Sequence, residues 1–330
     1  TYFARLCLVQ VACAQRIAVI DILALDGPVV LAAALATPAR VKLLHAARQD
    51  LEVLHFAGLG LAAPLVDTQV AAALAGFDEQ IGYAELVREL LGITLDKSQT
   101  RTDWRQRPLS ARQLQYAADD VRHLDALGAA LRERLEALGR TPWLDEECAG
   151  LADPAVYDPP LRDAWQRVKG LAGAPPAAFA AGVLLARWRE ERARERDLPR
   201  GWVLKDAELL ALAHAAPRNL AELAALLTDN PAFVRRHGDA VLAVLGGGLA
   251  ADDDAVQAVS AGPPSPAQRQ RAKDCAARVR ACAESLGISP AVLLTRREIE
   301  RLVAGQAPAR AVRGWRAAPL AAIVAEFGTP

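Results

Sequence analysis

Two stretches rich in proline, glycine and aspartate divide this chain of 330 residues. The first runs from 153 to 176 and the second from 246 to 266. Such residues favour turns and interrupt helices and strands, so each stretch predicts a break between folded parts. The expected organisation is three domains and two linkers. Their limits are 1–150 for the first domain, 151–176 for a linker, 177–250 for the second domain, 251–264 for a linker and 265–330 for the third domain.

Short apolar runs alternate with helical patterns in the first domain. The runs at 6–11 and 17–20 are separated by a short polar break and predict a hairpin, whereas those at 41–45 and 64–67 lie between helical stretches. This pattern predicts an α/β layer with a mixed sheet.

Two helices of the first domain have clear ends. A helix over 84–91 is expected to stop at Gly92, because glycine readily takes the left-handed conformation that ends helices. Ser110 and Gln113 have the spacing of a capping box, and the helix that follows is expected to run to about Gly139.

Beyond residue 150 the pattern contains no convincing strand. It predicts four helices in the second domain, with Asp206, Asn219 and Asn230 as caps, and further helices after Ser265 and Ser289. Trp188 and Trp202 are both expected to be packing anchors.

Composition excludes several classes of protein. With 52% hydrophobic and 24% charged residues the chain is not disordered, and no apolar run is long enough for a membrane span. Its five cysteines are scattered and never form a CxxC pair, which indicates neither a disulfide framework nor a zinc site and favours the cytoplasm. Residues 1–150 hold 15 basic and 19 acidic side chains, whereas residues 151–330 hold 24 and 20. The difference suggests cation binding in front and anion binding behind.

Carboxylates are the candidate catalytic groups. The sequence has no phosphate-binding glycine loop, no GxSxG elbow and no HExxH helix. Tyr116 and Asp120 are four residues apart and therefore share one helix face, and Asp119 is almost as well placed. Asp50 follows an apolar strand, at the edge where α/β proteins commonly hold ligands. Taken alone, the carboxylates beside Tyr116 could instead form a solvated acidic helix face, and Asp50 could be a helix-start aspartate stabilised by the helix dipole.

A polar loop over 96–104 is a candidate nucleic-acid contact. Lys97 and Arg101 could grip phosphates, and Trp104 could stack on a base. As an isolated loop it could equally be ordinary solvated surface.

Several segments of the chain together carry a resemblance to a known family. They are Thr-Tyr-Phe at 1–3, Leu-His-Ala at 44–46, Asp-Leu-Glu-Val-Leu at 50–54, Asp-Thr-Gln at 67–69, Thr-Asp-Trp at 102–104, Tyr-Ala-Ala-Asp-Asp at 116–120, Arg-Trp-Arg-Glu at 187–190 and Leu-Pro-Arg-Gly-Trp at 198–202. In order and spacing they resemble the DEDD 3′-to-5′ exonucleases, and among them the bacterial ribonuclease D family. The resemblance covers nearly the whole chain, and the segments at 187–190 and 198–202 resemble an HRDC domain.

The resemblance implies a fold, an activity and a site. It implies a ribonuclease-H-like exonuclease domain followed by two all-α HRDC-type domains. Asp50 and Asp120 match metal-binding aspartates, and Tyr116 matches the tyrosine that orients the attacking water, which favours Asp120 over Asp119. His45, Lys97, Arg101 and Trp104 are expected to contact substrate. The resemblance also implies two Mg²⁺ or Mn²⁺ ions per site and the release of nucleoside 5′-monophosphates. The implied substrates are tRNA precursors with 3′ extensions, and residues 151–330 are expected to contribute RNA affinity. A cytoplasmic location and no membrane partner are expected.

The family's first motif, a strand carrying Asp-x-Glu, is expected just before Thr1. We therefore expect this sequence to be a fragment that is inactive by itself, with that central strand of the sheet missing. Two alternatives stay open: a DNA 3′-to-5′ exonuclease, and a noncatalytic adaptor built on a degenerate nuclease domain. The Asp-x-Glu codons upstream would favour an enzyme over the adaptor.

Overall fold

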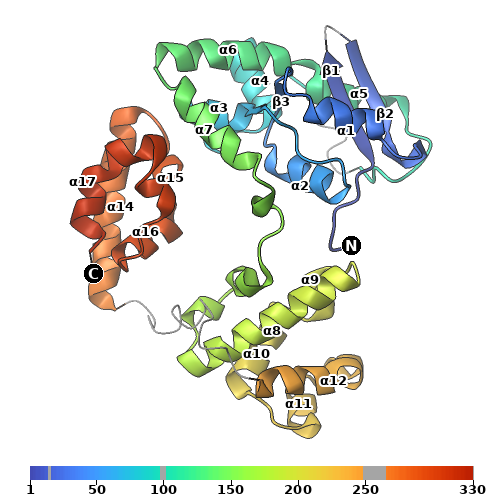
Figure 1. Ribbon diagram of the computed structural model, residues 1–330, viewed down its shortest axis with the longest axis vertical. Helices are drawn as coiled ribbons and strands as arrows, with labels where there is room; N and C mark the ends of the chain where they lie inside the picture. Colours follow the sequence, from blue (N-terminus) through green and yellow to red (C-terminus); the bar gives the residue numbers. More distant parts are fainter. Residues whose placement is uncertain (14–15, 97–101, 248–264, 330) are drawn as a thin grey trace. The chain divides into compact units, whose positions relative to one another are not determined.

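The computed structural model describes residues 1–13, 16–96, 102–247 and 265–329 (Figure 1). Two compact units emerge. One, here called the nuclease unit, comprises residues 5–157 and 266–330; the other, the HRDC unit, comprises residues 1–4 and 158–265. The second unit is thus inserted into the sequence of the first, and residues from the very front of the chain belong to it.

Four strands lie in the nuclease unit, in two separate pairs. Strands β1 (Leu8–Cys13) and β2 (Arg16–Asp21) form an antiparallel hairpin, with Leu8 opposite Asp21. Strands β3 (Lys42–Leu44) and β4 (Leu65–Asp67) are parallel, as expected for strands joined by a helical connection. All four predicted strands are therefore confirmed, and both pairing modes of a mixed sheet are present. The two pairs are not hydrogen-bonded to each other in the described part of the chain.

Helices cover these strands. The helices of the first domain are α1 (Val29–Ala36), α2 (Arg48–Phe56), α3 (Thr68–Leu74), α4 (Tyr83–Leu91), α5 (Ala111–Arg122), α6 (Leu124–Ala137) and α7 (Thr141–Leu151). Helix α4 ends at Gly92 with φ 71°, and Ser110 and Gln113 form the predicted capping box at the start of α5. Helix α5 packs against both strands of the hairpin (Figure 1).

The single helix predicted from Ser110 to about Gly139 is wrong. The chain forms two helices, α5 and α6, with His123 between them at φ −107°. The backbone N–H of His123 donates to the hydroxyl of Tyr83 at 3.0 Å instead of continuing the helix. This tertiary bond replaces a helical one, and the local sequence pattern does not contain it.

The HRDC unit encloses a core of its own. Its helices are α8 (Pro176–Glu195), α9 (Arg200–Val203), α10 (Asp206–Ala215), α11 (Leu220–Leu226) and α12 (Pro231–Gly246). Trp188 is buried in that core, as predicted, but the prediction for Trp202 is wrong because its side chain is 78% exposed. Asn219 and Asn230 are caps as predicted, whereas Asp206 is the first residue of α10, and Lys205 occupies the cap position.

A buried carboxylate fastens the front of the chain to the HRDC unit. The hydroxyl of Tyr2 donates to Glu190, whose side chain is 2% exposed. Arg167 and Arg200 bind the same carboxylate at 2.9 and 2.5 Å. Asp197 accepts hydrogen bonds from the backbone N–H groups of residues 2 and 3. The segment that leads into β1 is therefore part of the HRDC unit's packing.

The last helices share the core of the nuclease unit. They are α14 (Pro266–Leu286), α15 (Pro290–Leu293), α16 (Arg296–Val303) and α17 (Ala317–Phe327). Val279 and Leu302 belong to the same buried cluster as Leu51 and Leu86. Among the described residues, no helix has the length and apolarity needed to cross a membrane.

Polar contacts reinforce this shared core. The guanidinium of Arg140 donates to the carbonyl of Leu74 at 2.6 Å and also to that of Leu286. The rings of Trp143 and Trp315 stack with centroids 4.2 Å apart, and Arg316 forms a two-point ion pair with Glu147.

Candidate active site

Asp50 lies in the first turn of α2. The apolar residues Leu51 and Leu54 of that helix are buried and fix which side faces the core. Asp50 therefore points outward and reaches solvent. Although the residue is exposed, the surrounding protein displaces part of the water around its carboxylate, which raises the pKa of Asp50 to about 6, and the negative charge of Asp67 adds to the shift.

Tyr116 and Asp120 lie on α5, one turn apart. Ala117 is the fully buried residue of this helix, and the hydroxyl-bearing ring of Tyr116 is half-buried beside it. Loss of water raises the pKa of Asp120 to about 6, with further contributions from the charges of Asp119 and Asp50. The carboxylates predicted from two distant segments, Asp50 and Asp120, are therefore close enough to repel each other.

Asp119 is turned to different partners. Its carboxylate accepts a hydrogen bond from Arg122 at 2.6 Å and from the side-chain amide of Gln115 at 2.9 Å. A carboxylate neutralised by an arginine on its own helix has less need of a cation. This geometry supports Asp120, rather than Asp119, as the functional residue.

The chemistry of this pair fits a divalent cation. Carboxylate oxygens are the ligands that Mg²⁺ and Mn²⁺ prefer, and a bound cation would relieve the repulsion between Asp50 and Asp120. No cluster of three or more His, Cys, Asp or Glu side chains suited to a metal ion occurs among the described residues. The pair therefore offers carboxylate ligands but does not by itself form a complete set of metal ligands.

His45 is held by its neighbours. Its Nδ1 lies 2.9 Å from the hydroxyl of Thr68, and its Nε2 lies 3.1 Å from the carbonyl oxygen of Ile81. Burial lowers the pKa of His45, against the opposing effects of Asp67 and of the bond to Ile81. Both ring nitrogens are thus engaged with the protein, which makes His45 a part of the turn that precedes α2.

Tyr83 connects the two sides of the site, and sequence reasoning gave it no role. Its hydroxyl donates to the carbonyl of Asp119 at 3.1 Å and accepts from the N–H of His123. Its ring also meets that of His45 edge to face, with centroids 5.7 Å apart. Only the folded contacts show which segments this tyrosine holds together.

Trp104 stacks on Tyr116, with ring centroids 6.2 Å apart and an interplanar angle of 29°. Arg107 fixes the loop that carries Trp104, because it donates to the Trp104 carbonyl at 2.8 Å and to both carboxylate oxygens of Asp21 at 2.6 Å. Of the predicted substrate contacts, Trp104 thus lies beside the site. Lys97 and Arg101 lie outside the described residues.

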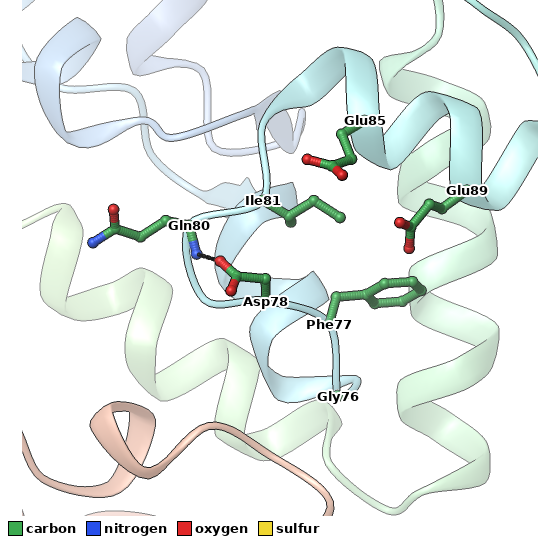
Figure 2. A pocket seen from close by; sticks show the side chains of 7 residues that line it. All are labelled: Gly76, Phe77, Asp78, Gln80, Ile81, Glu85 and Glu89. Atoms are coloured by element: carbon green, nitrogen blue, oxygen red, sulfur yellow. Dashed lines mark hydrogen bonds between the residues drawn. The ribbon is translucent and has the colours of Figure 1, made fainter.

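A separate hollow of about 410 Å³ lies between α3 and α4 (Figure 2). Its walls include the carboxylates of Asp78, Glu85 and Glu89, but not Asp50 or Asp120. Figure 2 shows these acidic side chains around the opening, with the Asp78 carboxylate accepting from the N–H of Gln80. Such a lining repels phosphates, so this hollow does not extend the candidate site.

Comparison with known proteins places the chain in a family. The family model of 3′-5′ exonucleases matches residues 1–136, and that of HRDC domains matches residues 183–245. Ribonuclease D of Gluconacetobacter diazotrophicus is 37% identical over 325 residues, which cover 96% of this chain and 81% of that protein. Ribonuclease D of Acidiphilium cryptum is 39% identical over 336 residues, covering 96% and 82%. The solved structure of Escherichia coli RNase D matches with a TM-score of 0.83 at 31% identity, covering 99% of this chain and 89% of that one.

Fold and comparisons define an exonuclease domain of the 3′-to-5′ class followed by an HRDC domain. The chain belongs to the ribonuclease D family and is a 3′-to-5′ exoribonuclease. The predicted family, the enzyme class and the fold class of an exonuclease domain followed by an HRDC domain are confirmed, in preference to the DNA-exonuclease and adaptor alternatives. The helices over 266–330 share the core of the nuclease unit. Membership of this family implies dependence on divalent metal ions and RNA as the substrate class.

Proposed function

We propose that Asp50, Tyr116 and Asp120 form the hydrolytic centre of this exoribonuclease. The observation that carries the proposal is that Asp50 and Asp120, from separate helices, lie close enough for the charge of Asp50 to contribute to the raised pKa of Asp120, which shares a helix with Tyr116. Two carboxylates brought together at the cost of mutual repulsion are typical of a cation-binding site.

Each residue has a distinct role in this proposal. Asp50 and Asp120 hold divalent cations, Mg²⁺ or Mn²⁺, two per site in the complete enzyme. When bound, such cations activate water and stabilise the leaving oxygen of a phosphodiester. The hydroxyl of Tyr116 donates a hydrogen bond to the attacking water and orients it. The indole of Trp104, stacked on Tyr116, offers a face to the terminal base, and His45 holds the turn before Asp50.

Substitutions on α5 test these roles in the full-length protein. Asp120→Asn should lower the rate on a 3′-extended RNA by several orders of magnitude, because it removes a metal ligand. Tyr116→Phe should cost a smaller factor, on the order of 10², as expected for positioning a nucleophile. Asp119→Asn is the matched control and should matter less. Full activity of Asp120→Asn at saturating Mg²⁺ would refute the assignment, and a larger loss in Asp119→Asn would show that the register is wrong.

We propose tRNA precursors with 3′ extensions as the substrates and nucleoside 5′-monophosphates as the products. Support comes from the family name shared by the relatives and from the E. coli enzyme, whose structure is described as that of an exoribonuclease involved in structured RNA processing. We also propose that the predicted helical domains, over 177–250 and 265–330, contribute RNA affinity. A tRNA with and without a 3′ extension, compared with an unstructured RNA of equal length, tests this choice.

We propose the cytoplasm as the location. The support is that all five cysteines are free thiols, as expected in a reducing compartment. Detection of the tagged full-length protein in a cytoplasmic fraction of cells would test it.

A further inference from the structure

Asp67 is a buried carboxylate that binds two helix starts at once. It is the last residue of β4, and its side chain is 3% exposed. No cationic side chain pairs with it among the residues that the structure describes. Four backbone N–H groups surround it instead, so peptide dipoles compensate its charge.

These four donors come from two places in the chain. Oδ1 accepts from Gln69 at 2.8 Å and from Val70 at 3.4 Å, which caps α3 in the usual way. The same Oδ1 accepts from Ala46 at 3.0 Å, and Oδ2 accepts from Ala47 at 2.8 Å. Ala46 and Ala47 precede α2, whose cap residue, Ala47, has no side chain that could bond to the helix start.

The turn at Ala46 needs this support. Ala46 has φ 54°, a left-handed conformation that costs an alanine free energy. Asp50 follows in the first turn of α2, so the direction of its carboxylate depends on where that turn begins. The neighbour Thr68 fastens the same region, because its hydroxyl donates to the carbonyl of Leu44 at 3.0 Å.

We propose that Asp67 is a positioning residue for Asp50: by accepting from Ala46 and Ala47 it holds the left-handed turn that places the Asp50 carboxylate. The inference rests on the proposed function of Asp50. It goes beyond it by assigning a role to a residue that touches neither substrate nor metal. Groups that orient a metal ligand typically change metal affinity or activity by about 10- to 100-fold when they are replaced.

Asp67→Asn in the full-length protein is the decisive variant. An asparagine with its oxygen at the Oδ1 position keeps the bonds to Ala46, Gln69 and Val70, but its amide group meets the N–H of Ala47 as a second donor. Val279→Ala in α14 is the control, because it destabilises the same core cluster without touching the turn. Four quantities are measured: kcat and KM on a 3′-extended RNA, the Mg²⁺ affinity by calorimetry without RNA, and Tm.

Asp67→Asn should lower kcat by about tenfold or more and weaken Mg²⁺ binding severalfold, with KM for RNA within about twofold of its original value. Val279→Ala should lower Tm and leave both kcat and Mg²⁺ affinity within about twofold. Wild-type kcat and Mg²⁺ affinity in Asp67→Asn would overturn the proposal, and so would losses no larger than those of the control.

Three further variants separate the possible failures. If Asp67→Asn does not fold, the exposed Ala46 tests the turn directly: Ala46→Gly should keep kcat, and Ala46→Val should lower kcat and Mg²⁺ affinity. Unchanged values in Ala46→Val would overturn the proposal. Asp50→Asn is the reference for the site itself. If Asp50→Asn is fully active, the proposed function fails; if it is inactive while Asp67→Asn behaves as wild type, only the present inference fails.

Discussion

The two helical parts of this molecule are similar in size but are built into it differently. Helices α8–α12 enclose a core of their own, centred on side chains such as Leu185 and Leu209. Helices α14–α17 have no separate core, because Val279 and Leu302 pack in one cluster with residues of the nuclease domain. The comparison teaches that a helical segment of similar size can be either an independent unit or the completion of another domain.

Charge separates the two parts as well. Residues 158–247 carry 13 basic and 11 acidic side chains, whereas residues 266–330 carry 11 and 5. Most of the positive charge of the back half therefore belongs to the part that shares the nuclease core. On helix α14, Lys273 and Arg280 lie two turns apart on one exposed face and have no ion-pair partner among the described residues.

The largest expected effect comes from the ion pair between the last helices and α7. Arg316→Met removes the cation that pairs with Glu147, leaves that carboxylate only the indole N–H of Trp315 as a donor in the part of the chain that the structure describes, and should lower the free energy of unfolding of the nuclease unit by about 3–5 kcal/mol. Hydrogen exchange should show faster opening of α7 and α14 and unchanged protection in α8. A second change, Glu147→Leu, should recover much of the loss. Unaltered exchange in α7 would contradict the shared core.

A similar change in the HRDC unit should act on that unit alone. Glu190→Gln weakens the bonds to Arg167, Arg200 and Tyr2 and should cost about 3 kcal/mol, seen as faster exchange in α8 and α10. Faster exchange in α14 as well would show that the two units unfold together.

The same carboxylate makes a pH prediction. Burial opposes ionisation of Glu190, but hydrogen bonds and charge from Arg200, Tyr2 and Arg167 outweigh it and lower its pKa below the ordinary 4.5. The unfolded chain therefore binds this proton more readily than the folded one. The stabilisation is complete above about pH 4.5 and is lost as the pH falls below that value. Thermal melts of the HRDC unit from pH 7 to 3 should show this loss in the wild type and a smaller loss in Glu190→Gln.

A smaller effect is expected where two backbones meet. Gly76 has φ 94°, and a Cβ added there would lie 2.7 Å from the carbonyl oxygen of Gly287. Gly76→Ala should therefore lower the stability of the nuclease unit by about 1–3 kcal/mol. Gly92→Ala is the matched control, since Gly92 also has positive φ but has no atom within 4 Å of the added Cβ. Equal Tm losses in the two variants would mean that the contact with Gly287 costs nothing.

The smallest effect concerns RNA binding. Replacing both Lys273 and Arg280 with glutamine should raise KM for a tRNA-sized substrate severalfold and reduce the logarithmic salt slope by roughly 0.7–0.9 per lost phosphate contact. The control replaces Arg235 and Arg236, two exposed arginines of α12 that have no ion-pair partner in the described part of the chain. A larger effect of the α12 pair would show that the HRDC unit contributes more of the RNA affinity than α14 does.

The sequence was most informative where structure is local. The hairpin of β1 and β2, the end of α4 at Gly92 and the capping box at Ser110 follow from spacing and residue type, and all are confirmed. The i,i+4 spacing of Tyr116 and Asp120 likewise placed both on one helix, although the roles of these residues stay predictions.

Features that depend on contacts between distant residues could not be predicted from the sequence. The break at His123 involves a bond to Tyr83, 40 residues earlier, and the exposure of Trp202 is a property of the folded chain. Asp67 could be read as a helix cap, but its bonds to Ala46 and Ala47 belong to the folded state alone. The periodicity of apolar residues within one segment does not contain this information, because it predicts the helix or strand of that segment and not the contacts that the segment makes with distant parts of the chain.

The shared core has a consequence for how this chain folds during synthesis. Arg140 binds Leu286, 146 residues later, and Glu147 binds Arg316, 169 residues later. The inserted HRDC helices leave the ribosome before those partners and can close their own core at once. The nuclease part must wait with apolar surface uncovered until residues 266–330 have emerged, since contacts of such long sequence separation form late. Chaperone binding to ribosome-bound chains should therefore persist after the HRDC helices have emerged and end only when α17 is free.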